Sequence, residues 1–203
     1  MKIFSKFSAE AVKIILKNGI GVIPTDTIYG IVCSAFSKRA INEIYRLRKR
    51  SANKPVIVLI GSKSDVRMFG VKLDPRTSNI LNKLWPGPVS IILQIANSKK
   101  QIAKFKYLHR GKKAIAFRMP AVPASRRFLS KTGPLIAPSA NFEGKQPAKT
   151  IKEAQKYFGD NVYFYVDGGK LKSKPSTLLS IKNGKLHIIR KGAGGAKIKH
   201  AST

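Results

Sequence analysis

The sequence predicts a single α/β domain in which helices cover a mixed, twisted β-sheet. Helix-like and strand-like segments alternate along most of the 203 residues, and the 43% hydrophobic content is enough for a continuous core. Near the end of the chain, two strand-like segments flank Asn183-Gly184, the strongest short signal for a β-hairpin. Hairpins pair antiparallel and helical connections favour parallel pairs, so the sheet should contain both kinds of pairing.

The first predicted elements are a capped helix and a short strand. Ser8 can cap a helix whose apolar residues recur at helical spacing over 11–16, and Asn18-Gly19 supplies a left-handed stop. A strand is expected over 21–23, followed by a polar loop over 24–30. Loops at strand tips are common ligand-holding positions, so this loop is a candidate site.

A second helix should begin at Ser37 and bury Ile41, Ile44 and Tyr45. Arg48 lies seven residues after Ile41 and therefore continues the same inward-facing stripe. A charged group in that position requires an ionic or hydrogen-bonding partner. Arg48 is therefore a candidate ligand for an anion.

The middle of the chain is expected to form one helix and three strands. Asp74-Pro75 opens the helix, and a Trp-Pro-Gly-Pro sequence breaks it after residue 84. The strands are apolar runs over residues 56–60, 89–95 and 114–117. The lysine-rich stretch 97–113 is expected to be a mobile surface loop.

The last third of the chain is expected to contain two helices and four strands. The helices cover 123–131 and 151–158, and Thr150 starts a Thr-x-x-Glu capping box before the second. The strands are expected over 135–137, 162–166, 178–182 and 185–190. Residues from 191 onward carry glycines and basic residues without an apolar period, which is typical of a frayed tail. We therefore expect a domain over 1–193 and a basic, flexible tail over 194–203.

The chain is strongly basic, with 40 Lys and Arg against nine Asp and Glu and a net charge of +31. Such a charge attracts polyanions, so a nucleic acid or nucleotide partner is credible. A lysine-rich proteome would produce the same charge, so charge alone names no partner. No segment has the roughly 18 consecutive apolar residues of a membrane span, and no signal-type hydrophobic block is present. We therefore expect no membrane association and a cytoplasmic location.

Cysteine and histidine give little support for a metal site or a nucleophile. Cys33 is single and follows an apolar stretch, so it is expected to be a small buried thiol. The three histidines, at 109, 187 and 200, lie far apart, and no metal-ligand or Ser-His-Asp arrangement is suggested. Neither a P-loop nor a dinucleotide-binding glycine pattern is present. The remaining chemistry is stabilisation of anions by arginine and lysine.

Three polar segments, 25–30, 138–141 and 175–177, fall at predicted strand ends. Each one alone is more typical of a turn or helix cap than of a binding site. Basic residues fall at strand ends or in adjoining loops as well, at Arg48, Arg50, Lys54, Arg118 and Arg190. If these groups converge on one concavity, hydroxyls and amides would hold an amino acid or ribose, and arginines would hold carboxylate or phosphate.

Eight motifs follow one another from about residue 19 to residue 193: IPTDTIYGI, IYRLRKRSANKPVIVLI, LWPGPVSIIL, AIAFRMP, PLIAPSANFEGKQPAKT, VDGG, PSTLLS and IIRKGA. In this order they resemble the YrdC-like family of threonylcarbamoyl-AMP synthases, in its short single-domain form. The resemblance implies a YrdC-like fold around a basic cavity, with 1–193 as the catalytic domain. It also implies a nucleotidyltransferase that converts L-threonine, bicarbonate and ATP, with Mg²⁺, to L-threonylcarbamoyladenylate and pyrophosphate. The product would pass to a threonylcarbamoyl transferase complex that modifies tRNA.

The same resemblance implies roles for individual residues. Threonine would be held by Thr27, Arg118, the backbone at Ala137, and Thr177. ATP would be held by Arg50, Lys54, Ser139, Asn141 and Arg190, with Arg48 and Arg50 as the catalytic cations, and no protein-held metal is assigned. The family usually has lysine at the position of Arg48, where the charge is kept. A histidine that longer members carry near Leu59 is absent, and an aspartate after the PST motif is replaced by Ser180 or its neighbour, which receives no role.

Two alternatives stay open at this level. A non-catalytic protein that binds double-stranded RNA or tRNA is favoured by the +31 charge and by the lysines of 99–113, although the 8% aromatic content forms no stacking array. Weak tRNA or RNA binding beside catalysis is expected in any case. A carbamoyl-transferring domain of the hydrogenase-maturation type is the second alternative, but the acylphosphatase and zinc-finger modules of such proteins are missing here.

Overall fold

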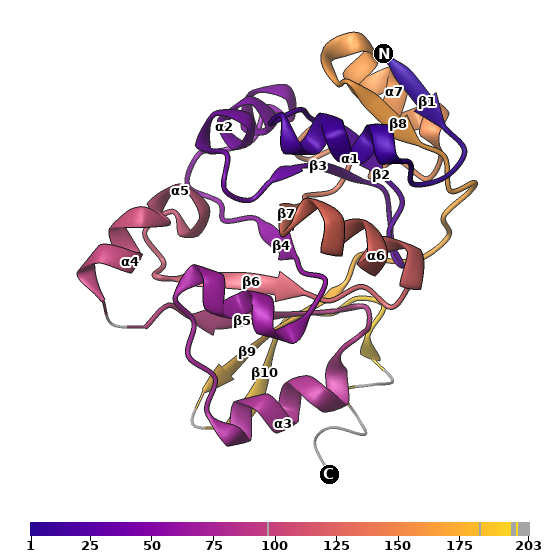
Figure 1. The fold of residues 1–203 in the computed structure, drawn as a ribbon. Coiled ribbons are helices and arrows are strands. Elements are labelled where there is room, and N and C mark those ends of the chain that lie inside the picture. The colour runs from indigo at the N-terminus through magenta and orange to yellow at the C-terminus, as the bar shows by residue number, and fades with distance from the viewer. Residues whose placement is uncertain (97, 183, 196–197, 199–203) are drawn as a thin grey trace.

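The computed structural model describes residues 1–96, 98–182, 184–195 and 198, which form one mixed α/β fold (Figure 1). The strands in chain order are β1 (Lys2–Phe4), β2 (Gly21–Ile23), β3 (Gly30–Ser34), β4 (Ile57–Leu59), β5 (Val89–Gln94), β6 (Ala114–Arg118), β7 (Leu135–Ile136), β8 (Phe164–Val166), β9 (Thr177–Lys182) and β10 (Lys185–Arg190). The α-helices are α1 (Ala9–Leu16), α2 (Lys38–Leu47), α3 (Pro75–Leu84), α4 (Lys99–Lys104), α5 (Lys106–His109), α6 (Pro123–Thr132) and α7 (Ile151–Phe158). Two 3₁₀ helices are η1 (Lys63–Phe69) and η2 (Gly159–Asn161).

The ten strands of the described residues join one sheet in the order β1-β8-β2-β3-β7-β4-β6-β5-β9-β10. Five neighbouring pairs are antiparallel and four are parallel, so the predicted mixed sheet is confirmed. The predicted hairpin is confirmed as the antiparallel β9–β10 pair. In its turn, Asn183 lies outside the described residues and Gly184 has a φ of 71°, the left-handed region that glycine adopts without strain.

Four helices begin where the sequence placed a capping side chain. The hydroxyls of Ser8, Ser37 and Thr150 and the carboxylate of Asp74 each accept a backbone N–H in the first turn of the following helix. Such a contact satisfies one of the N–H groups that a helix start leaves without an intrahelical partner. The local sequence therefore fixes where α1, α2, α3 and α7 begin.

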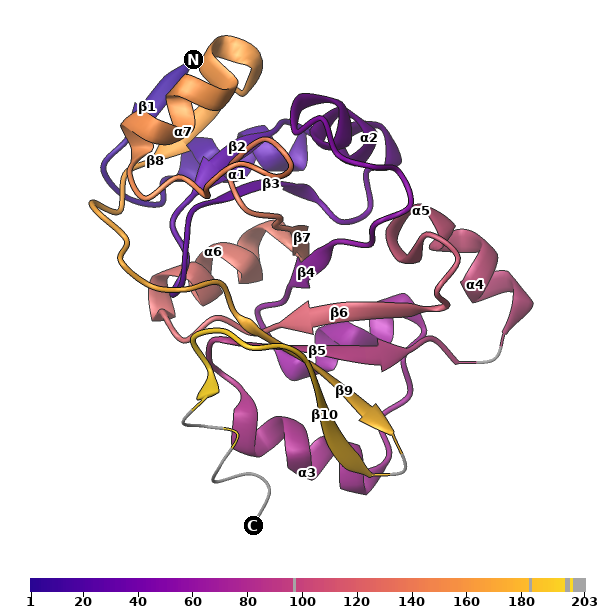
Figure 2. The ribbon, with the colours of Figure 1, turned by 180° about the vertical axis from the view of Figure 1, so that it is seen from behind.

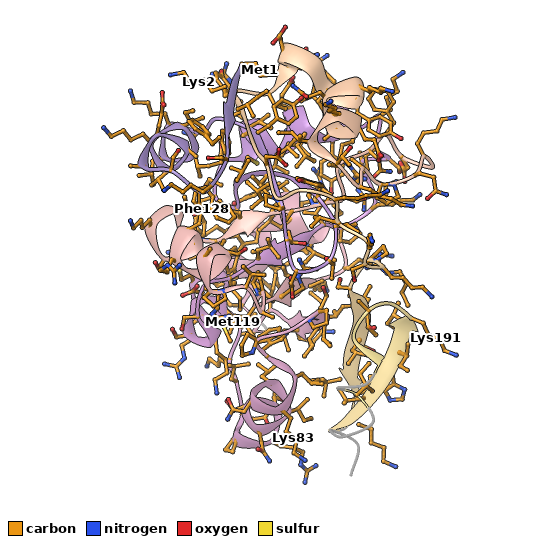
Figure 3. All side chains as sticks on the ribbon, turned by 90° about the vertical axis from the view of Figure 1, so that its right-hand side faces the viewer. Met1, Lys2, Lys83, Met119, Phe128 and Lys191 are labelled. Atoms are coloured by element: carbon orange, nitrogen blue, oxygen red, sulfur yellow. The ribbon has the colours of Figure 1, made fainter. Side chains whose placement is uncertain are left out.

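Two hydrophobic clusters hold the helices to the sheet. The smaller cluster joins α1 and α6 to the sheet and includes Ile15 of α1, Phe128 of α6 and Phe164 of β8. The Phe7 and Phe128 ring centroids lie 4.8 Å apart. In Figure 1, α1 and α6 lie in front of the sheet. Figure 2 shows the opposite side, where the β9–β10 hairpin and the connection from β8 to β9 face the viewer. Figure 3 shows Phe128 of α6 and Lys191 after β10 on opposite sides of the molecule.

The prediction of a mobile loop over 97–113 is wrong for the described residues of this stretch. Residues 99–104 form α4, which Ser98 caps, and 106–109 form α5. Phe105, Leu108 and His109 are buried, because Phe105 packs against Phe69 with ring centroids 5.3 Å apart. Apolar residues at 102, 105 and 108 give this segment a buried side. The dense lysine composition hid this short period from the sequence reading.

The segment after β10 is also more ordered than the predicted frayed end. The Ala193 N–H donates to the Pro175 carbonyl, and the N–H groups of Gly192 and Gly194 donate to Thr177 Oγ1, each at 3.1 Å. A Cβ on Gly192 would lie 2.1 Å from the Pro175 oxygen, so only glycine fits this approach. Apart from 194, 195 and 198, the predicted tail over 194–203 lies outside the described residues.

The sequence reading did not assign strands to 2–4 or 30–34, which form β1 and β3. Cys33 of β3 is fully buried, as predicted, and burial raises the pKa of its thiol. In the described part of the chain, no helix combines the length and apolar character that crossing a membrane requires.

Candidate active site

A cavity of about 380 Å³ collects most of the groups predicted to form the site, and this volume is typical of small-molecule pockets. Its floor includes the small or apolar side chains Ile92, Ala114, Ala116 and Leu178 from β5, β6 and β9. Its polar lining comes from Thr25, Thr27, Ser139, Ser176, Arg48, Arg50, Lys112, Arg118 and Arg190. The three polar loop tips therefore converge, as the sequence predicted, although the first is more than a hundred residues from the second in the chain.

Arg118 ends β6 and forms a buried polar cluster with the first polar tip. Its Nη1 donates to Thr27 Oγ1 at 2.9 Å, and Thr27 Oγ1 lies 3.0 Å from Thr25 Oγ1. Its Nη2 lies 3.2 Å from Asp26 Oδ1, close enough for an ion pair, although the angle is not that of a hydrogen bond. The loop 24–30 is thus held by the arginine that the resemblance assigns to threonine binding.

Arg48 caps the end of α2 and holds the second polar tip. Its Nε donates to the carbonyls of Ser139 and Asn141 at 2.9 and 3.1 Å, and its Nη2 donates to Ser139 Oγ at 3.1 Å. Asn141 does not line the cavity, because its Nδ2 donates to the carbonyls of Phe142 and Lys145. The sequence prediction that Arg48 faces inward is confirmed by its 3% exposure.

Arg50 and Lys54 are separated by the structure. Arg50 lines the cavity and donates from Nη2 to the Pro55 carbonyl at 2.8 Å. Lys54 is exposed and pairs with Glu143 at 2.5 Å, outside the cavity lining. Glu143 also accepts the Ser51 N–H, and these contacts with Lys54 and Ser51 lower the pKa of its carboxyl. Lys54 therefore supports the 51–54 turn in this structure.

The third polar tip is joined to the end of β10. Arg190 donates from Nη2 to the Ser176 carbonyl at 2.9 Å, and both residues line the cavity. Thr177 does not line it, because its Oγ1 faces the N–H groups of Gly192 and Gly194. Ser176 Oγ instead lies 2.9 Å from the buried Ser90 Oγ. The residue of the PST motif that lines the cavity is therefore Ser176 and not Thr177.

Ala137 also lines the cavity. Its N–H donates to the Ile57 carbonyl at 2.9 Å, so only its carbonyl oxygen is suited to meet a ligand. On the neighbouring strand, Gly30 pairs with Ser139 in an isolated bridge. Tyr29 is fully buried beside them and donates to the Gly169 carbonyl at 2.9 Å. The VDGG turn thereby fixes the loop that carries Thr27.

Some of the arginine nitrogens around the cavity have no hydrogen-bond partner among the described residues. Burial lowers the pKa of Arg48 to about 10 and also lowers the pKa values of Arg118 and Arg190. Arg48 and Arg118 are 3% and 5% exposed, whereas Arg190 is exposed. Arg48 Nη1, Arg50 Nε and Arg118 Nε are buried and have no hydrogen-bond partner among the described residues. Buried polar groups in proteins are nearly always paired, so three such nitrogens around one cavity indicate an anionic ligand.

The lining of the cavity contains no carboxylate, and no cluster of metal-ligating side chains occurs in the described ranges. Asp26, the nearest acid on this loop, is engaged by Arg118 and by the Ala121 N–H. Magnesium in nucleotide sites is held by one or two carboxylates together with substrate phosphates. The residues present therefore do not fit a magnesium ion held by the protein itself.

Three contributors to the site were missed by the sequence reading: Asp26, Ser176 and Lys112. Asp26 and Ser176 stand inside quoted motifs, and their neighbours Thr27 and Thr177 were chosen instead. Lys112 lies just before β6 in the stretch that was expected to be mobile. No local signal separates it from Lys113, which does not line the cavity.

Comparison with known proteins now assigns the family. A family model named Sua5/YciO/YrdC, with the description "Telomere recombination", matches residues 13–192. The chain belongs to the Sua5/YciO/YrdC family. The YrdC-like resemblance inferred from the eight motifs is thus confirmed.

Two relatives of this family are curated as threonylcarbamoyl-AMP synthases. A putative enzyme of Methanocaldococcus jannaschii is 33% identical over 181 residues, covering 89% of this chain and 83% of the relative. An enzyme of Marinobacter nauticus is 32% identical over 182 residues, covering 87% of this chain and 92% of the relative. Each of the two alignments therefore extends over most of both proteins.

Among solved structures of the Sua5/YciO/YrdC fold, Pyrococcus abyssi Sua5 complexed with L-threonine superposes with a TM-score of 0.83 at 22% identity. The match covers 95% of this chain and 57% of the Pyrococcus protein. At this identity the likeness establishes the fold, and the predicted YrdC-like fold class is confirmed.

Proposed function

We propose that this chain is a threonylcarbamoyl-AMP synthase, which converts L-threonine, bicarbonate and ATP to threonylcarbamoyl-AMP and pyrophosphate. The curated names of its relatives and its place in the Sua5/YciO/YrdC family support this activity. The observation that carries the proposal is the set of buried arginine nitrogens without partners around one cavity. A substrate that brings a carboxylate and phosphates would satisfy them.

Threonine is assigned to the deep end of the cavity, at the end of β6. Arg118 Nε is the guanidinium nitrogen available to a carboxylate, since Nη1 and Nη2 face Thr27 and Asp26. The Ala137 carbonyl is suited to accept a hydrogen bond from the amine. The resemblance also assigned Thr177 to threonine, but we give it an indirect role. Its hydroxyl accepts the Gly192 N–H, and this contact holds the segment in which Arg190 donates to the Ser176 carbonyl.

ATP is assigned to the part of the cavity bounded by Arg48, Arg50, Ser139 and Arg190. Arg48 Nη1 and Arg50 Nε are the donors without partners there, and arginine offers planar, directional donors to phosphate oxygens. Lys54 and Asn141 remain assigned to ATP binding only indirectly, through the loops that they fix.

The proposed reaction needs no nucleophilic side chain. Bicarbonate takes up a proton and loses water to give CO₂. The threonine nitrogen attacks the carbon of CO₂, and the N–H proton that leaves as the carbamate forms balances the proton taken up by bicarbonate. A carbamate oxygen then attacks the α-phosphorus of ATP while the bond from that phosphorus to the bridging oxygen breaks, and pyrophosphate leaves with the electron pair. Charge grows on phosphate oxygens in this step, and deleting one preorganised donor at such a centre typically costs about 3–4 kcal/mol. Arg48 and Arg50 are proposed to supply that stabilisation.

Magnesium enters this proposal only as a companion of ATP, because the cavity lining holds no carboxylate. We also propose the cellular location and the partners that this activity would have. The chain would act in the cytoplasm, bind tRNA or other RNA weakly, and pass its product to a threonylcarbamoyl transferase complex for tRNA modification. The alternative of an RNA-binding protein without catalysis gives no reason for the buried arginines Arg48 and Arg118 beside one cavity.

The decisive experiment is product formation by the purified chain. Incubation with ATP, magnesium, radiolabelled bicarbonate and each amino acid in turn should release pyrophosphate and form labelled threonylcarbamoyl-AMP with threonine. Pyrophosphate release that depends on neither threonine nor bicarbonate would contradict the assignment. Arg48→Ala should lose the activity, whereas Arg46→Ala is a matched control, because Arg46 lies on the same helix but is 69% exposed.

A further inference from the structure

Lys112 stands out among the groups that line the cavity, because it comes from outside the eight sequence motifs. It is exposed, so it lies at the rim of the cavity, and no carboxylate lies within ion-pair distance of it in the described part of the chain. We propose that Lys112 binds the β- and γ-phosphates of ATP, and that buried His109 positions it. This inference rests on the proposed function and adds two residues to its site.

The turn that carries Lys112 is built around the His109 ring, which is 2% exposed. Its Nδ1 accepts the N–H groups of Gly111 and Lys113 at 3.1 and 3.3 Å, so the ring carries its proton on Nε2. Nε2 lies 2.8 Å from the Ile102 carbonyl of α4, to which it donates. Both ring nitrogens are therefore used to tie the turn to the helix before it.

The backbone of this turn is also unusual. Arg110 and Lys113 have φ values of 48° and 54°, a left-handed conformation that residues with a side chain seldom adopt. The Lys112 N–H donates to the His109 carbonyl at 2.9 Å, and the Ile95 N–H donates to the Lys113 carbonyl at 3.1 Å. Strained backbone that is fixed by several contacts occurs preferentially at functional sites. The turn thus holds the base of the Lys112 side chain in one place.

The length of β6 decides which substrate Lys112 can reach. Ala114, Ala116 and Arg118 alternate along β6 and all line the cavity. The four steps from Ala114 to Arg118 span about 13 Å at the usual rise per residue, and Lys112 lies beyond Ala114. Threonine bound at Arg118 is far too short to touch Lys112, whereas ATP, whose α-phosphate must meet the carbamate, extends that far. Because an ammonium is a compact point charge, the charged polyphosphate suits it better than the neutral adenine.

Nucleotide binding measured by calorimetry tests this assignment independently of turnover. Lys112→Gln should weaken the binding of ATP and of inorganic pyrophosphate about tenfold, the lower end expected for a charged hydrogen bond. Binding of AMP and adenosine should be unchanged, and Lys112→Arg should restore ATP binding. Lys113→Gln is the matched control, since Lys113 is exposed on the same turn but does not line the cavity.

His109→Phe tests the positioning role, because it keeps a ring of similar size and removes the Nδ1 acceptor. It should weaken ATP binding to the extent of Lys112→Gln, and adding Lys112→Gln to it should cause little further loss. A full further tenfold loss in the double variant would overturn the role of His109. His109→Gln, which keeps an acceptor oxygen, should by contrast retain ATP binding, and this comparison stands even if His109→Phe does not fold. A tenfold loss of ATP binding in His109→Gln would overturn the role of the Nδ1 acceptor.

Unchanged ATP binding in Lys112→Gln would overturn the role of Lys112, as would an equal loss in Lys113→Gln. A loss of adenosine binding in Lys112→Gln would overturn the phosphate assignment in favour of the base. A wild-type chain that binds ATP but releases no pyrophosphate with threonine would defeat the proposed synthase activity instead, while leaving the Lys112 comparison intact.

Discussion

Replacing Arg118 by alanine should cost both stability and threonine binding, for reasons that can be separated. The Arg118 and Asp26 side chains are 6% and 7% exposed, and their charged atoms lie 3.2 Å apart. Without the arginine, the buried Asp26 carboxylate keeps one hydrogen bond among the described residues, from the N–H of Ala121 at 3.1 Å. The hydroxyl of Thr27 loses its guanidinium donor as well.

The expected loss follows from leaving a buried charge without its partner. Removing one member of a buried ion pair typically costs about 3–5 kcal/mol. For a domain of this size, each kcal/mol lowers Tm by about 2–4 °C, so Arg118→Ala should melt about 6–20 °C lower than wild type. Adding Asp26→Asn removes the unpaired charge and should recover part of that loss, leaving about 1–3 kcal/mol for the hydrogen bonds. Both variants should still fail to bind threonine.

Urea unfolding gives the stability of the three proteins, and calorimetry gives the affinity for threonine. The reasoning would be refuted if Arg118→Ala lost less than 1 kcal/mol, or if the double variant were no more stable than Arg118→Ala alone. Threonine binding that survives in Arg118→Ala would remove this arginine from the substrate site.

Four further predictions address other parts of the site. Arg50→Glu should abolish pyrophosphate release without lowering Tm by more than a few degrees, and an active variant would remove Arg50 from the site. Serine should replace threonine with a loss of tens-fold in kcat/KM, since one methyl is worth about 1–3 kcal/mol, and equal rates would defeat the pocket assignment. Thr177→Val should lower stability and ATP affinity together, because the N–H groups of Gly192 and Gly194 lose their acceptor, while Thr177→Ser should stay near wild type. If only the KM for threonine rises, Thr177 binds threonine directly. Four lysines of α4 and α5 are proposed to contact RNA: Lys99, Lys100, Lys104 and Lys106. Neutralising them should weaken RNA binding in filter assays and lower the slope of its salt dependence by about one unit per lost phosphate contact, while pyrophosphate release stays unchanged. A loss of pyrophosphate release would place these lysines in the site.

Much of the fold was predictable because the decisive signals are local. The caps at Ser8, Ser37, Asp74 and Thr150 each act within one helical turn, and all four helices begin where those residues stand. The inward position of Arg48 followed from its place on the stripe of α2. Where the sequence reading failed, at α4 and α5, composition outweighed a short apolar period that becomes evident only against Phe69.

The sequence predicted which segments form the site better than it predicted which of their side chains face the cavity. The roles of Lys54 and Thr177 depend on Glu143 and on Gly192 and Gly194, which are not neighbours in sequence. No local pattern reveals that a side chain will be occupied by such a distant partner. Lys112 was missed for the converse reason, because a turn fixed by His109 brings an unremarkable lysine to the cavity rim.

The β5–β9 pairing has a consequence for how the protein becomes competent during synthesis. Val89 of β5 pairs with Thr177 of β9, and Arg190, which completes the cavity, ends the strand after that. A growing chain therefore cannot hold its ligands until residues near 190 have left the ribosome, however early the first loop tip has folded. Once complete, the cavity links loops from nearly the whole length of the chain, and a ligand at about 100 times its Kd would stabilise the folded state by about 2.7 kcal/mol. ATP should accordingly slow proteolysis of the connection over 167–176 as well as of the loops that it touches.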